Sequence, residues 1–161
     1  MSRLTLEEVI EAHPTLGEAG FGVGTSEGLL ETRGQFDAVC DLLANVEPTK
    51  TINRKHASYG LKHVFELLTP ERYLGEGTFI AAAIASGFTC ERGQRNSCQF
   101  NMAEKSIEAI REHLWATRDN PPIAPPRCFY YAKSWAKRKA NYSGKLAGEQ
   151  PPVWESATAA A

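Results

Sequence analysis

The feature that most constrains the fold is a series of short apolar stripes at helical spacing. Apolar residues three and four positions apart lie on one face of a helix. Such stripes recur in four segments of the chain: 5–12, 35–46, 56–68 and 103–116. Pro48 and Pro70 follow the second and third stripes, and the residue before a proline avoids helical backbone. The sequence therefore predicts a mainly helical protein.

The stretch from 76 to 101 adds a further helix and a hairpin to this plan. "TFIAAAIAS" reads as a helix over 76–86, in which Thr78 can cap the start and Gly87 can provide the left-handed stop. Apolar residues then alternate on either side of the turn "RGQRN" over 88–101, which is typical of two paired strands. The predicted fold class is mainly α with a small β-hairpin (α+β).

Helix 56–68, helix 76–86 and the hairpin follow one another in the order of a helix-turn-helix pair with a wing. The second helix would then be the one that reads DNA. Its sequence offers no Arg, Lys, Asn or Gln for base edges. We therefore expect the helix-turn-helix-like order without sequence-specific reading of the major groove by this helix.

The 161 residues suit a single domain followed by a tail. We expect a mostly helical domain over 1–120, whose parts are an acidic segment 1–48, a basic helix-turn-helix-like segment 49–101 and helix 103–116. The segments expected after it are a Pro-rich strap 121–126, a basic and aromatic segment 127–147 and a flexible tail 148–161.

The composition points to a cytoplasmic protein. No apolar run reaches the roughly 18 residues that cross a bilayer. The start "MSRLTLEEVIEAH" carries two adjacent glutamates in its apolar part, unlike a signal peptide. The four cysteines are then expected to be reduced thiols.

Charge is distributed unevenly along the chain. Residues 1–48 hold nine acidic and two basic side chains, a net −7, whereas residues 49–161 hold sixteen basic and ten acidic ones, a net +6. Such asymmetry predicts an acidic face and a basic face, or a contact between the two halves that neutralises both.

The glycine-rich stretch 17–34 raises the question of a phosphate-binding loop. Gly22 and Gly24 begin a G-x-G pattern, but Glu27 stands where the third glycine belongs. No strand pattern precedes the stretch and no G-K-[S/T] follows it. A mobile loop or an irregular hairpin is the better interpretation.

Catalytic and metal-binding patterns are weak. His56 and His63 are seven residues apart on one helix, about 10 Å of rise, which is too far for one metal ion. Cys90 and Cys98 could approach each other across the hairpin, and a zinc site that joins them to His56 or Cys128 stays open. No nucleophile lies in a recognisable signature. We expect no catalytic residues, metal or cofactor.

Basic and aromatic side chains provide the better candidates. Together they suit phosphate contact and stacking on unpaired bases. The candidate residues for nucleic-acid binding are Lys50, Arg54, Lys55, Lys62, Arg92, Arg95, Lys133, Trp135, Lys137, Arg138 and Lys139. The simpler interpretation of 127–147 is that its aromatic residues pack on the domain while its lysines remain in water.

The stretches "TINRKHASYGLKHVFE" and "YLGEGTFIAAAIASGF", with a later "FN", resemble small accessory proteins carried by phages and plasmids. The resemblance covers about residues 49–107. No activity is established for that group, so no functional residue carries over. The resemblance implies an accessory protein of a mobile element, and such proteins often bind DNA or block a host enzyme that acts on nucleic acid.

Two hypotheses follow. The first is a non-enzymatic accessory protein that binds DNA or RNA through the basic and aromatic residues above, in a salt-sensitive manner. The second is an inhibitor or adaptor that docks on a host nucleic-acid-processing or defence complex, as an anti-CRISPR protein or a nucleic-acid mimic does. Its contacts with the partner would come from four acidic residues: Glu27, Glu31, Asp37 and Asp41.

Overall fold

The computed structural model describes residues 3–69, 71 and 73–116 of the chain. Its first half contains helix α1 (Leu6–Ala12), strands β1 (Leu16–Gly17) and β2 (Gly20–Phe21), and helices α2 (Ser26–Leu30) and α3 (Arg33–Leu43). Its second half contains helix α4 (Ser58–Phe65), the short 3-10 helix η1 (Glu66–Leu68), helix α5 (Glu76–Ala85), strands β3 (Cys90–Arg92) and β4 (Cys98–Phe100), and helix α6 (Glu104–Ala116). The described strands form two antiparallel pairs, β1 with β2 and β3 with β4. The predicted fold class, mainly α with small hairpins, is confirmed.

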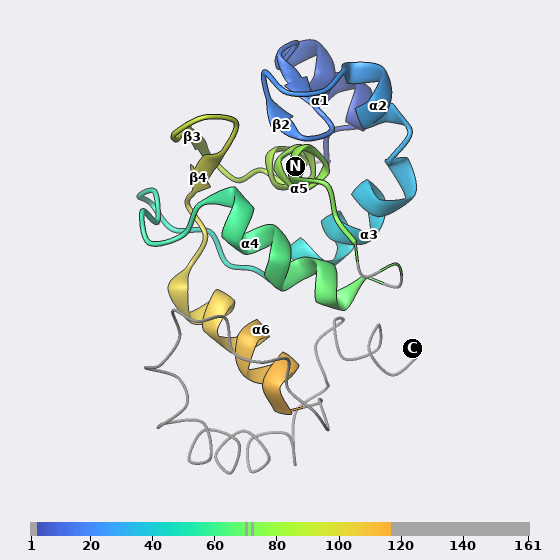
Figure 1. The fold of residues 1–161 in the computed structure, drawn as a ribbon. Helices are drawn as coiled ribbons and strands as arrows, with labels where there is room; N and C mark the ends of the chain where they lie inside the picture. The colour runs from blue at the N-terminus through green and yellow to red at the C-terminus, as the bar shows by residue number, and fades with distance from the viewer. Residues whose placement is uncertain (1–2, 70, 72, 117–161) are drawn as a thin grey trace.

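Helix α5 lies at the centre of the fold. Figure 1 looks nearly along it, with α1 and α2 above, α3 to the right, α4 below and the β3–β4 hairpin to the left. All its residues except Ile84 are buried. Its alanines let the neighbouring helices approach closely, and Phe79 fills the space toward Phe65 and Phe100. A helix enclosed in this way has no free face for a DNA groove, so the helix-turn-helix-like order does not make α5 a reading helix.

Local signals placed most of the helices correctly. The capping box at the start of α1 is present, since the Thr5 hydroxyl accepts from the Glu8 amide and the Glu8 carboxylate accepts from the Thr5 amide. Gly87 ends α5 with φ +89°. The expected cap of α5 is wrong: the helix begins at Glu76 after Gly75, without a side-chain cap. The Thr78 hydroxyl is buried and donates to Thr32 Oγ1 at 2.9 Å.

The glycine-rich stretch forms an irregular hairpin, β1–β2, and then the short helix α2, which the sequence did not predict. This hairpin packs directly on the start of α5. The Gly77 amide donates to Glu18 O at 3.0 Å, and a Cβ at Gly77 would lie 1.7 Å from Gly17 O. Only glycine permits so close an approach of the two backbones.

The segment between α3 and α4 runs beside β4. Isolated β-bridges join Pro48 to Met102 and Ala57 to Gln99. The backbone N–H of Asn53 donates to Phe100 O at 2.8 Å. This pairing places the first turn of α4 against the β3–β4 hairpin. Across the described residues, no helix combines the length and apolar character needed to cross a membrane.

Candidate functional site

A buried polar network joins α4, α5 and the β3–β4 hairpin. The Ser58 hydroxyl donates to Glu76 Oε1 at 2.6 Å and accepts from the Cys98 amide at 3.0 Å. The Asn96 side-chain amide donates to Glu76 Oε2 at 3.2 Å and to Ala19 O. Ser58 is fully buried and Glu76 nearly so, so both carboxylate oxygens accept hydrogen bonds inside the protein. The network fixes the orientation of α4, whose outer face is then available for contact.

Two exposed tyrosines, one on this face and one in the turn after η1, lie around a lysine of α4. Tyr59 is 58% exposed and Tyr73 is 64% exposed. The Lys62 ammonium lies 5.4 Å from the Tyr59 ring centroid and 6.0 Å from the Tyr73 ring centroid, within the range of a cation–π contact. These three residues are called the tyrosine face below.

Glu66 holds the charged groups of this face in place. Its carboxylate lies 3.5 Å from Lys62 Nζ and 2.5 Å from His63 Nδ1. His63 also meets the Tyr59 ring edge-on, with the two centroids 4.7 Å apart. Lys62, one of the predicted nucleic-acid-binding residues, is only 9% exposed, so its side chain offers little surface to a phosphate. The tyrosine rings and Glu66 cover its side chain.

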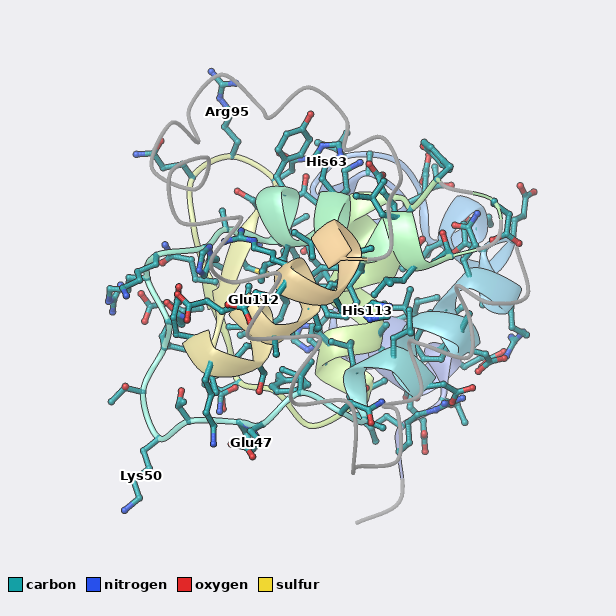
Figure 2. The ribbon with its side chains drawn as sticks, turned by 90° about the horizontal axis from the view of Figure 1, so that it is seen from below. Glu47, Lys50, His63, Arg95, Glu112 and His113 are labelled. Atoms are coloured by element: carbon teal, nitrogen blue, oxygen red, sulfur yellow. The ribbon has the colours of Figure 1, made fainter. Side chains whose placement is uncertain are left out.

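The other predicted basic residues of the domain are exposed, but they do not gather in one patch. Arg54 forms an ion pair with Glu91, and the Arg92 guanidinium lies 4.1 Å from the centroid of the Phe21 ring. Arg95 occupies the hairpin turn with φ +57°. In Figure 2, Arg95 and His63 project on the same side, whereas Lys50 extends from a distant part of the molecule. Lys55 lies in the turn at 54–55, shortly before α4.

Five predicted residues lie outside the described part of the chain. They are Lys133, Trp135, Lys137, Arg138 and Lys139. The predicted strap, the basic and aromatic segment and the tail fall there as well.

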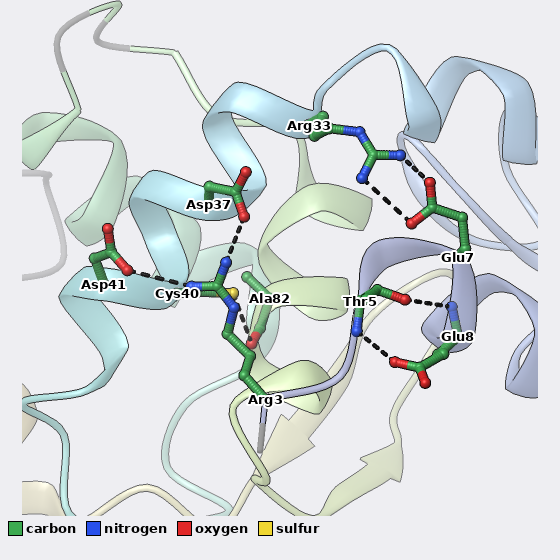
Figure 3. A network of polar contacts seen from close by, with 9 residues as sticks. All are labelled: Arg3, Thr5, Glu7, Glu8, Arg33, Asp37, Cys40, Asp41 and Ala82. Carbon is green, nitrogen blue, oxygen red and sulfur yellow. Dashed lines mark hydrogen bonds and ion pairs between the residues drawn. The ribbon is translucent and has the colours of Figure 1, made fainter.

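The acidic candidates are exposed on α2 and α3. Asp37 and Asp41 both pair with Arg3, at 2.5 and 3.2 Å (Figure 3). Glu27 and Glu31, in contrast, make no ion pair within the described residues. The same surface includes an ion pair between Glu7 and Arg33 (Figure 3), which lowers the pKa of Glu7.

The glycine-rich loop that resembles an anion-binding motif is filled by the protein itself. Glu18 Oε2 accepts from the Thr25 amide at 2.6 Å. This hydrogen bond lowers the pKa of Glu18. A Cβ at Gly24 or Gly28 would lie 2.2 and 2.7 Å from the same carboxylate oxygen. The glycines therefore make room for the Glu18 carboxylate, which occupies the space that a bound phosphate would need.

His56 is a partly buried residue whose ring contacts a carboxylate. Its Nε2 lies 2.9 Å from Glu104 Oε2, which also accepts from the Asn53 side-chain amide. Burial raises the pKa of Glu104, but hydrogen bonds from Asn53 and His56 outweigh it and lower that pKa. The contacts of Asn53 and His56 with Glu104 connect the segment before α4 to the first turn of α6.

Cys90 and Cys98 lie close enough across the hairpin for their thiols to interact. A hydrogen bond between them raises the pKa of the buried Cys98 thiol and lowers that of the half-buried Cys90. Within the described ranges, no three His, Cys, Asp or Glu side chains are grouped in a way that could hold a metal ion.

Sequence reasoning missed Tyr59, Glu66 and Tyr73 as site residues. Gly60, next to Tyr59, marks no close approach of another chain segment, since a Cβ there would meet nothing within 4 Å. The signal for Glu66 was available, since Lys62–Glu66 and His63–Glu66 have the spacings of helix side-chain pairs. Tyr73 gave no such signal, because it reaches Lys62 only through the turn after η1.

Comparison with known proteins returned no matching family model, no matching curated protein and no matching solved structure.

Proposed function

We propose that the protein is a non-enzymatic nucleic-acid-associated accessory protein of a mobile element. The observation that carries the proposal is the separation of charge in space. The acidic segment 1–48 forms α1, α2 and α3, which lie above and to the right of α5 in Figure 1. The segment 49–101, with seven basic and four acidic residues, supplies α4 and the β3–β4 hairpin on another side. The attribution to a mobile element comes from the resemblance described above.

A nucleic acid would approach the side of α4 and the hairpin, because phosphates are repelled by the carboxylates of α1 to α3. Arg95 and Lys55 are exposed there and form no ion pair within the described residues. Residues 117–161, with seven basic and three acidic side chains, add positive charge at the end of the chain. Phosphate contacts of this type give binding that tolerates sequence and weakens with salt.

The test is fluorescence anisotropy of the full chain with labelled DNA and RNA, in single and double strands, across a salt series. Arg95→Glu and the pair Arg138→Glu and Lys139→Glu should each weaken binding. Each lost phosphate contact should reduce the slope of log affinity against log salt by about 0.7 to 0.9.

Lys105→Glu is the matched control. It makes the same change of charge on α6, where Lys105 pairs with Glu47 at 2.6 Å, and it should leave the salt slope unchanged. Absence of binding at low salt, or equal losses in the control and the test variants, would contradict the proposal.

A second candidate is an inhibitor or adaptor that docks through its acidic side. The exposure of Glu27 and Glu31 without an ion pair in the described residues favours it, since free carboxylates on one side suit a basic channel. Reversal of Glu27, Glu31, Asp37 and Asp41 should abolish capture of such a partner while nucleic-acid affinity rises or stays constant. Loss of nucleic-acid affinity in that variant would count against this candidate.

A further inference from the structure

We infer that the tyrosine face, Tyr59, Lys62 and Tyr73, is a stacking site for the unpaired bases of single-stranded nucleic acid. This inference rests on the proposed function and specifies the strand type. None of the three residues was predicted as a stacking residue from the sequence.

The first support is the exposure of Tyr59 and Tyr73, which packing of the core does not require. A tyrosine that serves the core is buried, yet Tyr59 and Tyr73 both keep more than half of their residue surface exposed. Each tyrosine has a fully buried neighbour in the chain: Ser58 precedes Tyr59, and Leu74 follows Tyr73. The backbone at each tyrosine is therefore held, while the ring itself is presented to solvent.

The second support is the rigid arrangement of the rings. One ammonium, that of Lys62, lies near both rings, and Glu66 and the partial burial of Lys62 restrict its movement. The edge of His63 further restrains the Tyr59 ring. Rings that are already ordered lose little conformational entropy when a base stacks on them.

The third support is the charge around the face. Lys62 is paired with Glu66, so its charge is largely balanced and it orders the rings more than it attracts phosphate. Arg95 lies on the hairpin turn that leads to Cys98, and the Cys98 amide is bonded to Ser58, the neighbour of Tyr59. Arg95 and His63, which contacts the Tyr59 ring, project on the same side of the molecule (Figure 2), so a phosphate of a strand stacked on the rings would approach Arg95.

Stacking on exposed rings selects unpaired strands. Bases in a duplex already stack on one another, and they must be separated before a tyrosine ring can stack on one of them. Aromatic stacking tolerates sequence because every base has a flat face. The expected ligand is a single-stranded DNA or RNA without a preferred sequence.

The experiment compares the full chain with its Tyr59→Ala and Tyr73→Ala variants on a labelled oligothymidine strand and on a duplex of equal length. Loss of one stacked base should weaken single-strand binding roughly fivefold to a hundredfold. Duplex binding should change less than about twofold, since the phosphate contacts remain. Tyr59→Phe keeps the ring and should bind the single strand like the original protein.

A salt series separates stacking from charge. The alanine variants should lower single-strand affinity at every salt concentration without changing the slope, whereas Arg95→Glu should reduce the slope. If strands and duplexes bind in a salt-dependent manner but the alanine variants bind strands normally, the stacking site is refuted and the proposed function stands. If the original protein binds no nucleic acid at low salt, the proposed function fails and the stacking site fails with it.

Discussion

The glycine-rich loop at 17–28 and the tyrosine face differ in one decisive respect. Both present features that suit an anionic ligand: backbone amides in the loop, and basic and aromatic side chains on α4. In the loop, the Glu18 carboxylate occupies the space between the glycines. On the tyrosine face, Tyr59 of α4 and Tyr73 of the turn after η1 remain exposed to water. A pattern that suits a ligand can serve as a site only where the fold leaves the pattern accessible, and of these two regions only the tyrosine face is accessible.

The largest expected effect comes from replacing glycine by alanine at Gly77, which packs against the glycine-rich loop. The same substitution at Gly60 of α4, beside the tyrosine face, is its control. Gly77→Ala would place a Cβ 1.7 Å from Gly17 O, and neither backbone can move without disturbing α5. We expect a loss of about 3 kcal/mol or more in the free energy of unfolding, measured by denaturant titration.

Gly60→Ala is the control on the open side. A Cβ there meets nothing within 4 Å, and alanine favours a helix over glycine, so the protein should gain about 0.5 to 1 kcal/mol. Equal effects of the two substitutions would contradict the distinction between a closed and an open side.

Ser58→Ala tests the network beneath the tyrosine face. The change removes a donor to Glu76 and an acceptor for the Cys98 amide, both in buried surroundings. We expect a loss of about 2 kcal/mol in the free energy of unfolding, because buried polar groups remain without partners. The double variant with Glu76→Gln should lose less than the sum of the two single variants, since the groups interact directly. Simple additivity would show that the network does not act as a unit.

Glu18→Gln tests the filled loop. The folded-state pKa of Glu18 is lowered by the Thr25 amide. Its contribution to stability is therefore present above the unfolded-state pKa and is lost as the pH falls through the folded-state pKa. The variant should unfold at a lower denaturant concentration at neutral pH, with a smaller effect than Ser58→Ala. Below the folded-state pKa the two proteins should converge. A constant difference across the acid range would reject this role of the carboxylate.

Tyr59→Ala should have the smallest effect on stability. The ring is mostly exposed and its neighbours are held by the backbone, so the free energy of unfolding should change by no more than about 0.5 kcal/mol. Thermal unfolding followed by circular dichroism would measure it. A large loss would place Tyr59 among the residues that hold the fold together and would weaken the case for a binding face.

The sequence by itself determined the elements whose signals are local. The capping box of Thr5 and Glu8, the stripes of α3 and α6, the left-handed Gly87 and the β3–β4 hairpin each depend on residues a few positions apart. Such signals can be recognised without knowledge of the tertiary structure, because they involve neighbouring backbone groups and one helix or strand period.

Tertiary structure decided which of these elements face water. Glu18 fills the glycine loop, Lys62 is covered by Tyr59 and Tyr73, and α5 is enclosed by its neighbours only once the chain has folded back on itself. Contacts between residues distant in sequence depend on how whole elements pack, and one sequence carries no direct signal for them. The grouping of Tyr59, Lys62 and Tyr73, for which we propose base stacking, therefore appears only in the folded structure, because it depends on contacts between separate elements.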